Sequence, residues 1–347
     1  MEFKSYFQTT IDRGASDLHL VVGAKPSLRI DGELSPIDDT IITEDFMGQA
    51  LGVLLTEDRL RLFYENRELD FSADMFNHRF RINLHYQKGV VGLSARSIRM
   101  EVPTPEEVGF TPAISNLTRL RDGLILVTGP SGSGKSTTLA TMMQMINNSR
   151  RAHVVTVEDP IEYIFNHQLC VVEQREVGSD TLSFATALKY VLRQDPNIIM
   201  VGEMRDTETI AAVLTAAETG HLVLSTLHTN SAPETIARII DSFPSHRRQQ
   251  ILAQLSLTLR AVIAQQLLPR VGGGLVAVRE VMVNNQAVSN LIRENKINQL
   301  PTVIKTNYQS GMIDMNKSVQ LLFESGYIDE PTSIKYQRNT ETKAMYI

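Results

Sequence analysis

An octapeptide with three glycines, GPSGSGKS at residues 129–136, constrains this chain more than any other feature. It directly follows the apolar run LILVT at 124–128 and directly precedes a stretch with helical spacing. Glycines let the backbone curl so that its N–H groups converge on phosphate oxygens, and the start of a helix adds a positive dipole end. This is the phosphate-binding loop pattern in the strand–loop–helix context that it requires.

The same loop supplies groups for a nucleotide and its metal. We expect Lys135 to reach the β- and γ-phosphates of ATP and Ser136 to ligate Mg²⁺. An ordinary glycine-rich turn is the alternative, and the strand before it and the helix after it weigh against that interpretation. The residues expected to bind ATP are Gly129, Pro130, Ser131, Gly132, Ser133, Gly134, Lys135, Ser136 and Thr137.

Composition predicts a soluble protein of two or more domains. The chain has 347 residues, and no apolar run approaches the roughly 18 residues of a membrane span. The start of the chain lacks the apolar core of a signal peptide. The single cysteine, Cys170, excludes an intrachain disulfide and a cysteine-cluster zinc module and fits a reducing cytoplasm. A net charge of −5 does not attract nucleic acid, so no nucleic acid partner is expected.

Residues 1–100 predict an α+β domain with helices on one face of a mainly antiparallel sheet. Helices are expected at about 2–13 and 44–65, and Asp31-Gly32 between alternating residues predicts a two-residue hairpin. Further strands are expected at 68–75, 78–87 and 90–99. Residues 101–112 contain prolines and acids and are predicted to form a linker.

Alternating strands and helices follow the linker and predict a P-loop domain, built on a parallel sheet covered on both faces, over residues 113–285. Past residue 245 the spacing of apolar residues predicts a helix over 247–269, and 274–283 predicts a last hairpin or strand pair. Residues 286–347 predict a region of short helices. The parallel strands, each expected to precede a helical stretch, are 123–129, 153–160, 197–203 and 221–229.

A P-loop enzyme also needs carboxylates near its metal and its attacking water. The apolar run Ile198–Val201 leads into Glu203, at the carboxyl end of a predicted strand, where open α/β sheets bind their ligands. A second strand ends in Glu158 and Asp159, with Glu162 shortly after, so both strands would present acids at one edge of the sheet. Asp159 has an alternative role as a turn or helix-capping residue.

Histidines and arginines complete the candidate set. His228 follows a strand at the same edge and is expected to contact the γ-phosphate, whereas His221, at the start of that strand, fits a sensor and a structural residue equally. Arginines on a surface hairpin are common, but nucleotide hydrolysis often uses cations from a neighbouring domain or subunit. The arginines on adjacent predicted strands of the first domain are Arg79, Arg81, Arg96 and Arg99.

The motifs together resemble those of the secretion-type ATPase superfamily, and within it the type IV pilus retraction motors of the PilT family. GASDLHL (14–20) lies near the start of the chain, and VTGPSGSGKSTTL (127–139) is the Walker A motif. VTVEDPIEY (155–163) resembles the Asp box, LRQDPNIIMVGEMRD (192–206) the Walker B signature and TGHLVLSTLHTNSA (219–232) the His box. The likeness covers nearly the whole chain.

This resemblance implies a hexameric ring of subunits with a PAS-like N-terminal domain and a RecA-like domain. ATP would bind between the two domains, and its hydrolysis would drive pilus disassembly at the cytoplasmic face of the inner membrane. The implied partners are other copies of the chain, an inner-membrane platform protein and a paralogous pilus motor. Glu158, with Ser136, is the implied metal ligand, and whether Glu203 or Glu158 is the general base stays open. The implied catalytic residues are Glu203, Glu158, Glu162, His228, Arg81 and Arg96.

A single cysteine and a short N-terminal region favour retraction, because extension motors of the superfamily are typically longer and carry a four-cysteine zinc module. AVSNLIRE (287–294) resembles the retraction element AIRNLIRE, although Ser289 replaces its arginine, and Asn197 replaces the usual aspartate of the Walker B signature. Without the resemblance, the same segment predicts only an amphipathic helix. The candidate coupling residues are Asn290, Leu291, Ile292, Arg293 and Glu294.

Two other functions compete with a pilus motor. A RecA-like nucleic-acid translocase is disfavoured by a pI of about 5.9 and by the lack of a basic stretch. A regulatory scaffold that binds ATP without turnover would have a damaged acid set, whereas Glu158, Glu162 and Glu203 are all present. The sequence therefore favours a motor ATPase that powers pilus retraction.

Overall fold

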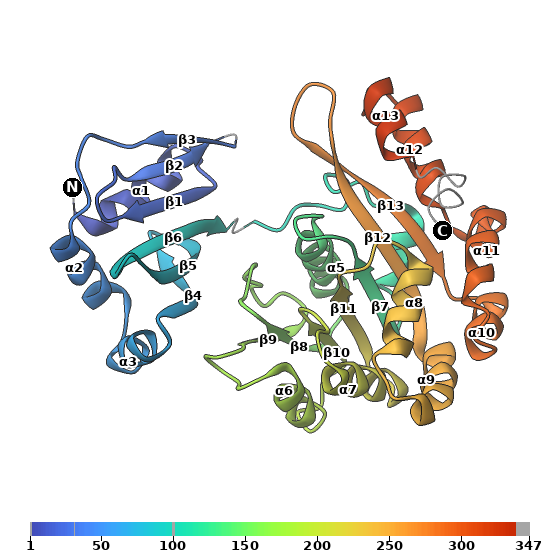
Figure 1. Ribbon diagram of the computed structural model, residues 1–347. Helices are drawn as coiled ribbons and strands as arrows, with labels where there is room; N and C mark the ends of the chain where they lie inside the picture. Colours follow the sequence, from blue (N-terminus) through green and yellow to red (C-terminus); the bar gives the residue numbers. More distant parts are fainter. Residues whose placement is uncertain (1, 31, 99–100, 338–347) are drawn as a thin grey trace. The chain divides into compact units, whose positions relative to one another are not determined.

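The chain forms two compact units, each with its own sheet. The first is Met1–Glu101 with the short segment Pro160–Ile164, and the second is Val102–Asp159 with Phe165–Ile347. Figure 1 shows this computed structural model, which describes residues 2–30, 32–98 and 101–337. Among these described residues, no helix combines the length and the apolar composition that a membrane span requires.

The N-terminal unit is an antiparallel sheet with helices, as the α+β prediction requires. Its strand order is β3-β2-β1-β6-β5-β4. β5 buries Phe80, Ile82 and Leu84 at alternate positions, which leaves Arg79 and Arg81 on the opposite face. The elements are α1 (Phe3–Asp12), β1 (Asp17–Val21), β2 (Ser27–Ile30), β3 (Glu33–Pro36), α2 (Glu44–Leu54), α3 (Glu57–Asn66), β4 (Glu68–Met75), β5 (His78–Gln87) and β6 (Val90–Ile98).

Two details of this unit bear on the sequence predictions. The hairpin is confirmed by the pairing of Ile30 with Glu33 in antiparallel β2 and β3, although Asp31 itself lies outside the described residues, as does Arg99. The prediction of a single helix over 44–65 is wrong, because the backbone is extended at Leu55 and divides the stretch into α2 and α3. Thr56 then starts a new helix, with its side-chain oxygen accepting a hydrogen bond from the Arg59 N–H at 3.5 Å.

The second unit has seven strands in the order β13-β12-β7-β11-β10-β8-β9. From β12 to β9 all neighbours are parallel, and β13 alone is antiparallel to its neighbour β12. The strands are β7 (Gly123–Thr128), β8 (His153–Glu158), β9 (Val171–Glu176), β10 (Ile198–Val201), β11 (Leu222–Leu227), β12 (Leu259–Pro269) and β13 (Leu275–Val283). The helices are α4 (Pro112–Leu117), α5 (Lys135–Ser149), α6 (Phe184–Val191), α7 (Thr207–Glu218), α8 (Ala232–Asp241), α9 (Ser245–Thr258), α10 (Gln286–Arg293), α11 (Leu300–Thr306), α12 (Met315–Glu324) and α13 (Glu330–Tyr336).

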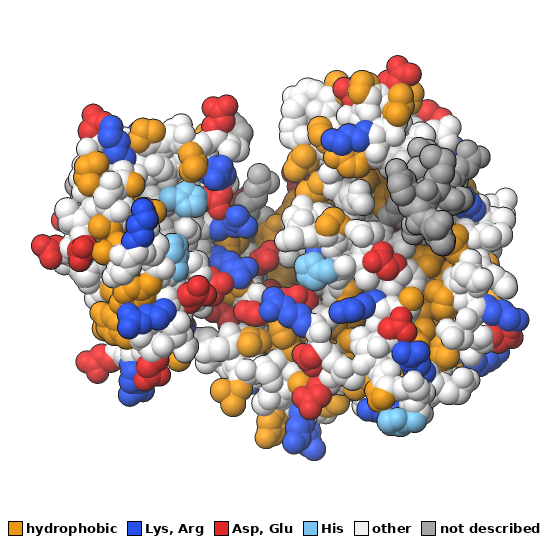
Figure 2. All heavy atoms as spheres, viewed as in Figure 1, with side chains coloured by type: hydrophobic (Ala, Val, Ile, Leu, Met, Phe, Trp, Pro, Cys, Tyr) orange, Lys and Arg blue, Asp and Glu red, His pale blue; other side chains and the backbone are white. Residues whose placement is uncertain are grey.

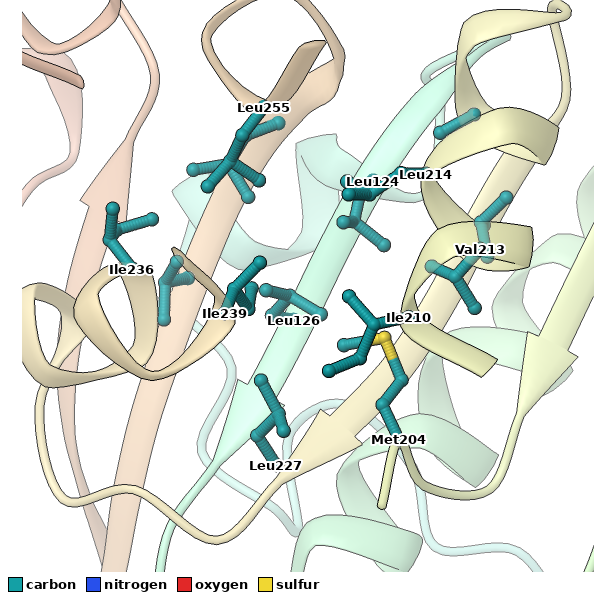
Figure 3. Close-up of a cluster of buried hydrophobic side chains, with 14 of the residues drawn as sticks. Leu124, Leu126, Met204, Ile210, Val213, Leu214, Leu227, Ile236, Ile239 and Leu255 are labelled. Atoms are coloured by element: carbon teal, nitrogen blue, oxygen red, sulfur yellow. The ribbon is translucent and has the colours of Figure 1, made fainter. Parts of the chain in front are cut away.

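A buried apolar cluster fixes the central strands of this unit. Figure 3 shows Leu124 and Leu126 of β7 pointing toward side chains from α7, α8 and α9, which cover one face of the sheet. Ile125 and Val127 alternate with them and are equally buried on the other face, where α5 packs against β7. The parallel sheet is therefore covered on both faces, as predicted, and its loops emerge only at the strand ends.

Two predictions for this unit are wrong. The helix predicted over 247–269 ends at Thr258, and the rest of that stretch is β12, inserted between β7 and β13. Hydrogen bonding to strands on both sides overrides the helical spacing of its apolar residues. β8 is followed by β9 rather than by a helix; β9 has the polar sequence VVEQRE because it lies at the edge of the sheet.

The strand assignment of β12 is testable by truncation of a core side chain. Ile263 is fully buried and pairs with Val127 of β7 and Val281 of β13. Ile263→Ala should lower the free energy of unfolding by roughly 2–5 kcal/mol, because it leaves a cavity in the centre of the sheet. Chemical denaturation measures this change. Leu275→Ala, at an exposed position of β13, should change it by less than about 0.5 kcal/mol; equal effects would contradict the assignment.

Candidate active site

The loop between β7 and α5 has the backbone that its glycines predict. Gly129, Gly132 and Gly134 have φ values of 148°, 75° and 83°. A Cβ atom on Gly129 would lie 2.2 Å from the carbonyl oxygen of Gln265, so a side chain there would collide with β12. Gly134 is the N-cap of α5, which places the free N–H groups of the first turn at the loop. The loop thus forms a concave set of N–H donors suited to phosphate.

The side chains of this loop provide further groups for an anion. Lys135 is buried, and its Nζ donates hydrogen bonds to the carbonyl oxygens of Gly129 and Pro130, both at 2.9 Å. The hydroxyl of Ser133 is buried and has no hydrogen-bond partner among the described residues. A buried polar atom of this kind is expected to have a water or a ligand atom as its partner.

Glu203 lies just beyond β10, where backbone hydrogen bonds hold the chain on both sides. The Gly202 N–H donates to the carbonyl oxygen of Val157 on β8 at 2.8 Å, and the Met204 N–H donates to that of Thr226 on β11 at 3.1 Å. Met204 then enters the apolar cluster, where Figure 3 shows its side chain reaching toward Ile210. The carboxylate is therefore fixed at the carboxyl edge of the sheet, where the P-loop also begins.

Two basic side chains contact the Glu203 carboxylate, which is only 15% exposed. One oxygen lies 2.5 Å from Arg205 Nη2 and the other 3.4 Å from His228 Nε2. Burial opposes ionisation, but the hydrogen bond and charge of Arg205, with those of His228, outweigh it and lower the pKa of Glu203. Arg205 also lies 4.0 Å from Asp159 at the end of β8. Glu203 is thus held as an anion, the form that can accept a proton.

Glu158 ends the neighbouring strand β8 and is buried. Its Oε1 accepts hydrogen bonds from the Thr156 hydroxyl at 2.6 Å and the Gln174 amide at 3.1 Å. These partners hold the carboxylate in one orientation at the same sheet edge as Glu203. A carboxylate and the Ser136 hydroxyl are hard oxygen donors, which is the ligand chemistry that Mg²⁺ prefers.

The two histidines lie at opposite ends of β11. His228 follows the carboxyl end and contacts Glu203, as its predicted place at the nucleotide edge requires. His221 precedes the amino end, and its Nδ1 lies 2.9 Å from the carbonyl oxygen of Ala216, in the last turn of α7. This position is at the edge of the sheet away from the P-loop, so the structure does not support a sensor role at this nucleotide site. We interpret His221 as a structural residue.

The candidate arginines belong to the N-terminal unit, where they form a compact group. Arg81 and Arg96 are direct cross-strand partners on β5 and β6. Each has its own acid: Arg81 Nη2 lies 3.2 Å from Asp70 Oδ2, and Arg96 Nε lies 2.9 Å from Asp17 Oδ1. These ion pairs offset the repulsion between two opposed cations. Glu162 lies in the segment Pro160–Ile164, which groups with this unit. The catalytic roles of all three stay predictions.

The predicted coupling element forms the C-terminal part of α10 and the residue after it. Ile292 is buried and Leu291 half-buried, whereas Arg293 and Glu294 are exposed; Arg293 donates to the Asn290 side chain at 2.6 Å. Ser289, which replaces an arginine of the retraction element, donates to the Ser256 carbonyl oxygen at 2.9 Å and so ties α10 to α9. Asn197 precedes β10 and accepts a hydrogen bond from the His153 N–H at 2.8 Å, a role in sheet structure.

The sequence prediction missed three polar residues of the site. Arg205 lies in the Walker B stretch, two residues before α7, and its pairing with Glu203 was visible only as proximity in sequence. Gln265 and Arg279 lie on β12 and β13, and Gln265 contacts the P-loop. No sequence signal marked them, because the stretch containing Gln265 was predicted to be a helix.

A P-loop, two carboxylates and a histidine at one edge of a parallel sheet define a nucleotide-hydrolysing P-loop enzyme. Comparison with known proteins gives the family. The family model described as type II/IV secretion system protein matches residues 104–273. The type IV pilus retraction ATPase PilT of Pseudomonas aeruginosa is 42% identical over 94% of this chain and 96% of its own. The type IV pilus ATPase PilU of the same organism is 38% identical over 94% of this chain and 86% of the PilU chain.

A solved structure agrees with these relatives. The crystal structure of the pilus retraction motor PilT with bound ADP matches with a TM-score of 0.92 at 42% identity, covering 99% of this chain and 98% of that one. The chain therefore belongs to the PilT family of secretion ATPases.

The contact between Arg205 and Glu203 predicts a pH-dependent stability. Because folding lowers the pKa of Glu203, the pair stabilises the fold above the usual glutamate pKa of about 4.3, and this contribution is lost as pH falls through the lowered value. Arg205→Gln should therefore lower the free energy of unfolding near about pH 7, and the deficit should shrink below about pH 4. Urea denaturation across this range measures it.

A double-mutant cycle isolates the contribution of this pair from those of other groups. In a Glu203→Gln background this carboxylate is absent, so most of the pH dependence of the Arg205→Gln effect should disappear, with the more distant Asp159 as the remaining acid. A deficit that keeps its pH dependence in that background would show that Arg205 acts on a different group.

Proposed function

We propose that this protein hydrolyses ATP to power retraction of a type IV pilus. The observation that carries the proposal is the convergence of the P-loop, Glu158, Glu203 and His228 at one edge of the sheet. The choice of retraction over extension is supported by membership of the PilT family. Its relatives are named as a pilus retraction ATPase and a twitching motility protein.

The chain's own residues divide the work of hydrolysis. The P-loop N–H groups and Lys135 bind the phosphates, and Glu203, held ionised by Arg205 and His228, accepts a proton from the attacking water. Ser136 and Glu158 would hold Mg²⁺, which neutralises charge on the phosphate oxygens when bound. The buried Ser133 hydroxyl offers a further donor to a phosphate oxygen.

The working assembly that we propose is a homo-hexamer at the cytoplasmic face of the inner membrane. It acts on an inner-membrane platform protein of the pilus machine and works beside a paralogous pilus motor. The exposed Arg293 and Glu294 of the α10 region are the proposed coupling residues. Figure 2 shows acidic and basic side chains intermixed on the visible face, which favours protein partners over nucleic acid.

Steady-state phosphate release by the purified protein tests the enzymatic part of the proposal. Glu203→Gln keeps the size of the side chain and removes its charge, so ATP should still bind while turnover falls roughly 10²- to 10⁴-fold. Lys135→Ala should instead remove binding and turnover together. Glu203→Gln turnover near the wild-type rate would remove Glu203 from the chemistry, and a wild-type protein that releases no phosphate would be a scaffold rather than a motor.

The arginine pair is proposed to act as a finger on the nucleotide of a neighbouring subunit. Arg81→Ala or Arg96→Ala should leave folding and ATP affinity nearly intact while lowering turnover by roughly 10³- to 10⁵-fold. Loss of an ordinary surface ion pair, which contributes roughly 0–1 kcal/mol, would change the rate by less than about tenfold. Arg79→Ala, whose guanidinium pairs with Asp74 on the same sheet, is the matched control.

Mixing subunits decides whether the finger acts across a boundary. A ring built only of Arg96→Ala or only of Glu203→Gln subunits lacks one of the two residues at every site. A mixed ring would contain sites that combine an intact Glu203 from one chain with an intact arginine from the next. Recovery of phosphate release on mixing is therefore the expected result. If neither arginine variant slows turnover more than a few-fold, both arginines are surface residues only.

A further inference from the structure

Gln265, in the middle of β12, contacts the P-loop at both of its ends. Its side chain is only 1% exposed. Its backbone carbonyl oxygen lies 2.2 Å from the position that a Cβ of Gly129 would take, and its side-chain Nε2 donates to the carbonyl oxygen of Ser133 at 2.7 Å. One residue of a neighbouring strand thus fixes the start of the loop by close packing and its end by a hydrogen bond.

The hydrogen bond to Ser133 sets the direction of a phosphate donor. In a trans peptide the C=O of one residue and the N–H of the next point in opposite directions. Because Gln265 binds the Ser133 carbonyl oxygen, the Gly134 N–H is turned away from β12. N–H groups turned to the inside of such a loop are those that bind phosphate.

The other half of the Gln265 amide is also held. Its Oε1 accepts hydrogen bonds from the Thr138 hydroxyl at 2.8 Å and from Arg279 Nε at 3.3 Å. An arginine can only donate and a carbonyl oxygen can only accept, so these partners leave one orientation for the amide. Arg279 therefore ensures that Gln265 presents its N–H₂ group to the P-loop.

Arg279 connects this amide to the first residues of the second unit. It is 6% exposed on β13, and among the described residues no carboxylate forms an ion pair with it. Burial lowers the pKa of Arg279 to about 10. Its Nη1 donates to the Gly109 carbonyl oxygen at 3.1 Å, and its guanidinium lies 5.4 Å from the centre of the Phe110 ring. A buried cation is costly unless its hydrogen bonds are satisfied, so this position is demanding to maintain.

The connector, defined here as residues 102–111, is ordered by its own hydrogen bonds. The Thr104 N–H donates to the Glu107 carboxylate at 2.7 Å, and the Phe110 N–H donates to the Pro105 carbonyl oxygen at 2.8 Å. It is also tied to α5, because the Thr141 hydroxyl donates to the Pro103 carbonyl oxygen at 3.1 Å. The connector thus contacts both the helix that follows the P-loop and the arginine that orients Gln265.

We propose that Gln265 and Arg279 form a relay that positions the P-loop for phosphate and couples its conformation to the connector. The relay rests on the proposed function, because it requires that residues 129–137 bind ATP. Gln265 is a positioning residue for the loop, and Arg279 transmits a change in the loop to the chain that leads to the N-terminal unit.

Gln265→Glu separates loop positioning from folding. A glutamate keeps an acceptor for Thr138 and gives buried Arg279 a counter-charge, so the thermal midpoint of the full-length protein should be unchanged or higher. The substitution replaces the Nε2 donor with a carboxylate oxygen, which faces the carbonyl oxygen of Ser133 and cannot donate to it. The affinity for a fluorescent ATP analogue with Mg²⁺ should therefore fall roughly tenfold. Gln266→Glu, the same change at the next residue on the other face of β12, should bind like wild type.

Hydrogen exchange measures the coupling. In wild type, saturating ADP should change amide exchange within residues 102–111. Arg279→Met fills the site without a charge, and ADP at a saturating concentration should then leave exchange in the connector unchanged. Ser318→Ala is the matched control: it removes the hydroxyl that accepts from the Arg279 backbone N–H at 3.2 Å and leaves the guanidinium in place. This variant should respond like wild type.

The results distinguish the relay from the proposed function. Wild-type affinity in Gln265→Glu, or a wild-type connector response in Arg279→Met, overturns the relay while the ATPase assignment stands. Failure of the wild-type protein to bind the analogue overturns both, because the loop would not be a nucleotide site.

Discussion

The parallel register of four central strands is the constraint on which the site depends. β7, β8, β10 and β11 all run in the same direction, so the P-loop, Glu158, Glu203 and His228 emerge at one edge although they are far apart in sequence. Apolar burial on both faces of the sheet holds the strands in that register. A charged residue at the end of such a strand is held in a fixed position by the packed sheet, and a fixed position of the reacting groups favours catalysis. The chemistry of the site is a consequence of the pairing of the sheet.

Charge within the site is balanced by neighbours rather than by solvent. Glu203 is partly buried and stays ionised because Arg205 and His228 contact its two oxygens. Glu158 Oε1 accepts hydrogen bonds from Thr156 and Gln174. In the proposed reaction Glu203 is the general base.

The sequence predicted those parts of the fold and site that local patterns determine. Glycines, apolar strands and the acids after them identified the P-loop, Glu158 and Glu203, because each signal lies within a few residues. β12 was missed because its apolar spacing also fits a helix, and only pairing with β7 and β13 makes it a strand. Gln265 and Arg279 could not be found for the same reason: their partners are 132 and 170 residues away in sequence. The positions of His221 and His228 at opposite ends of β11 were predicted correctly, because the apolar strand between them is a local pattern.

In the proposed function, hydrolysis at Glu203 drives retraction of pili. The most direct measurement is the number of surface pili and the twitching motility of cells in which the gene is deleted and then replaced by wild type or by Glu203→Gln. Deletion and the Glu203→Gln replacement should both give excess surface pili and no twitching, and wild type should restore movement. Loss of pili on deletion, or normal twitching with Glu203→Gln, would contradict the account.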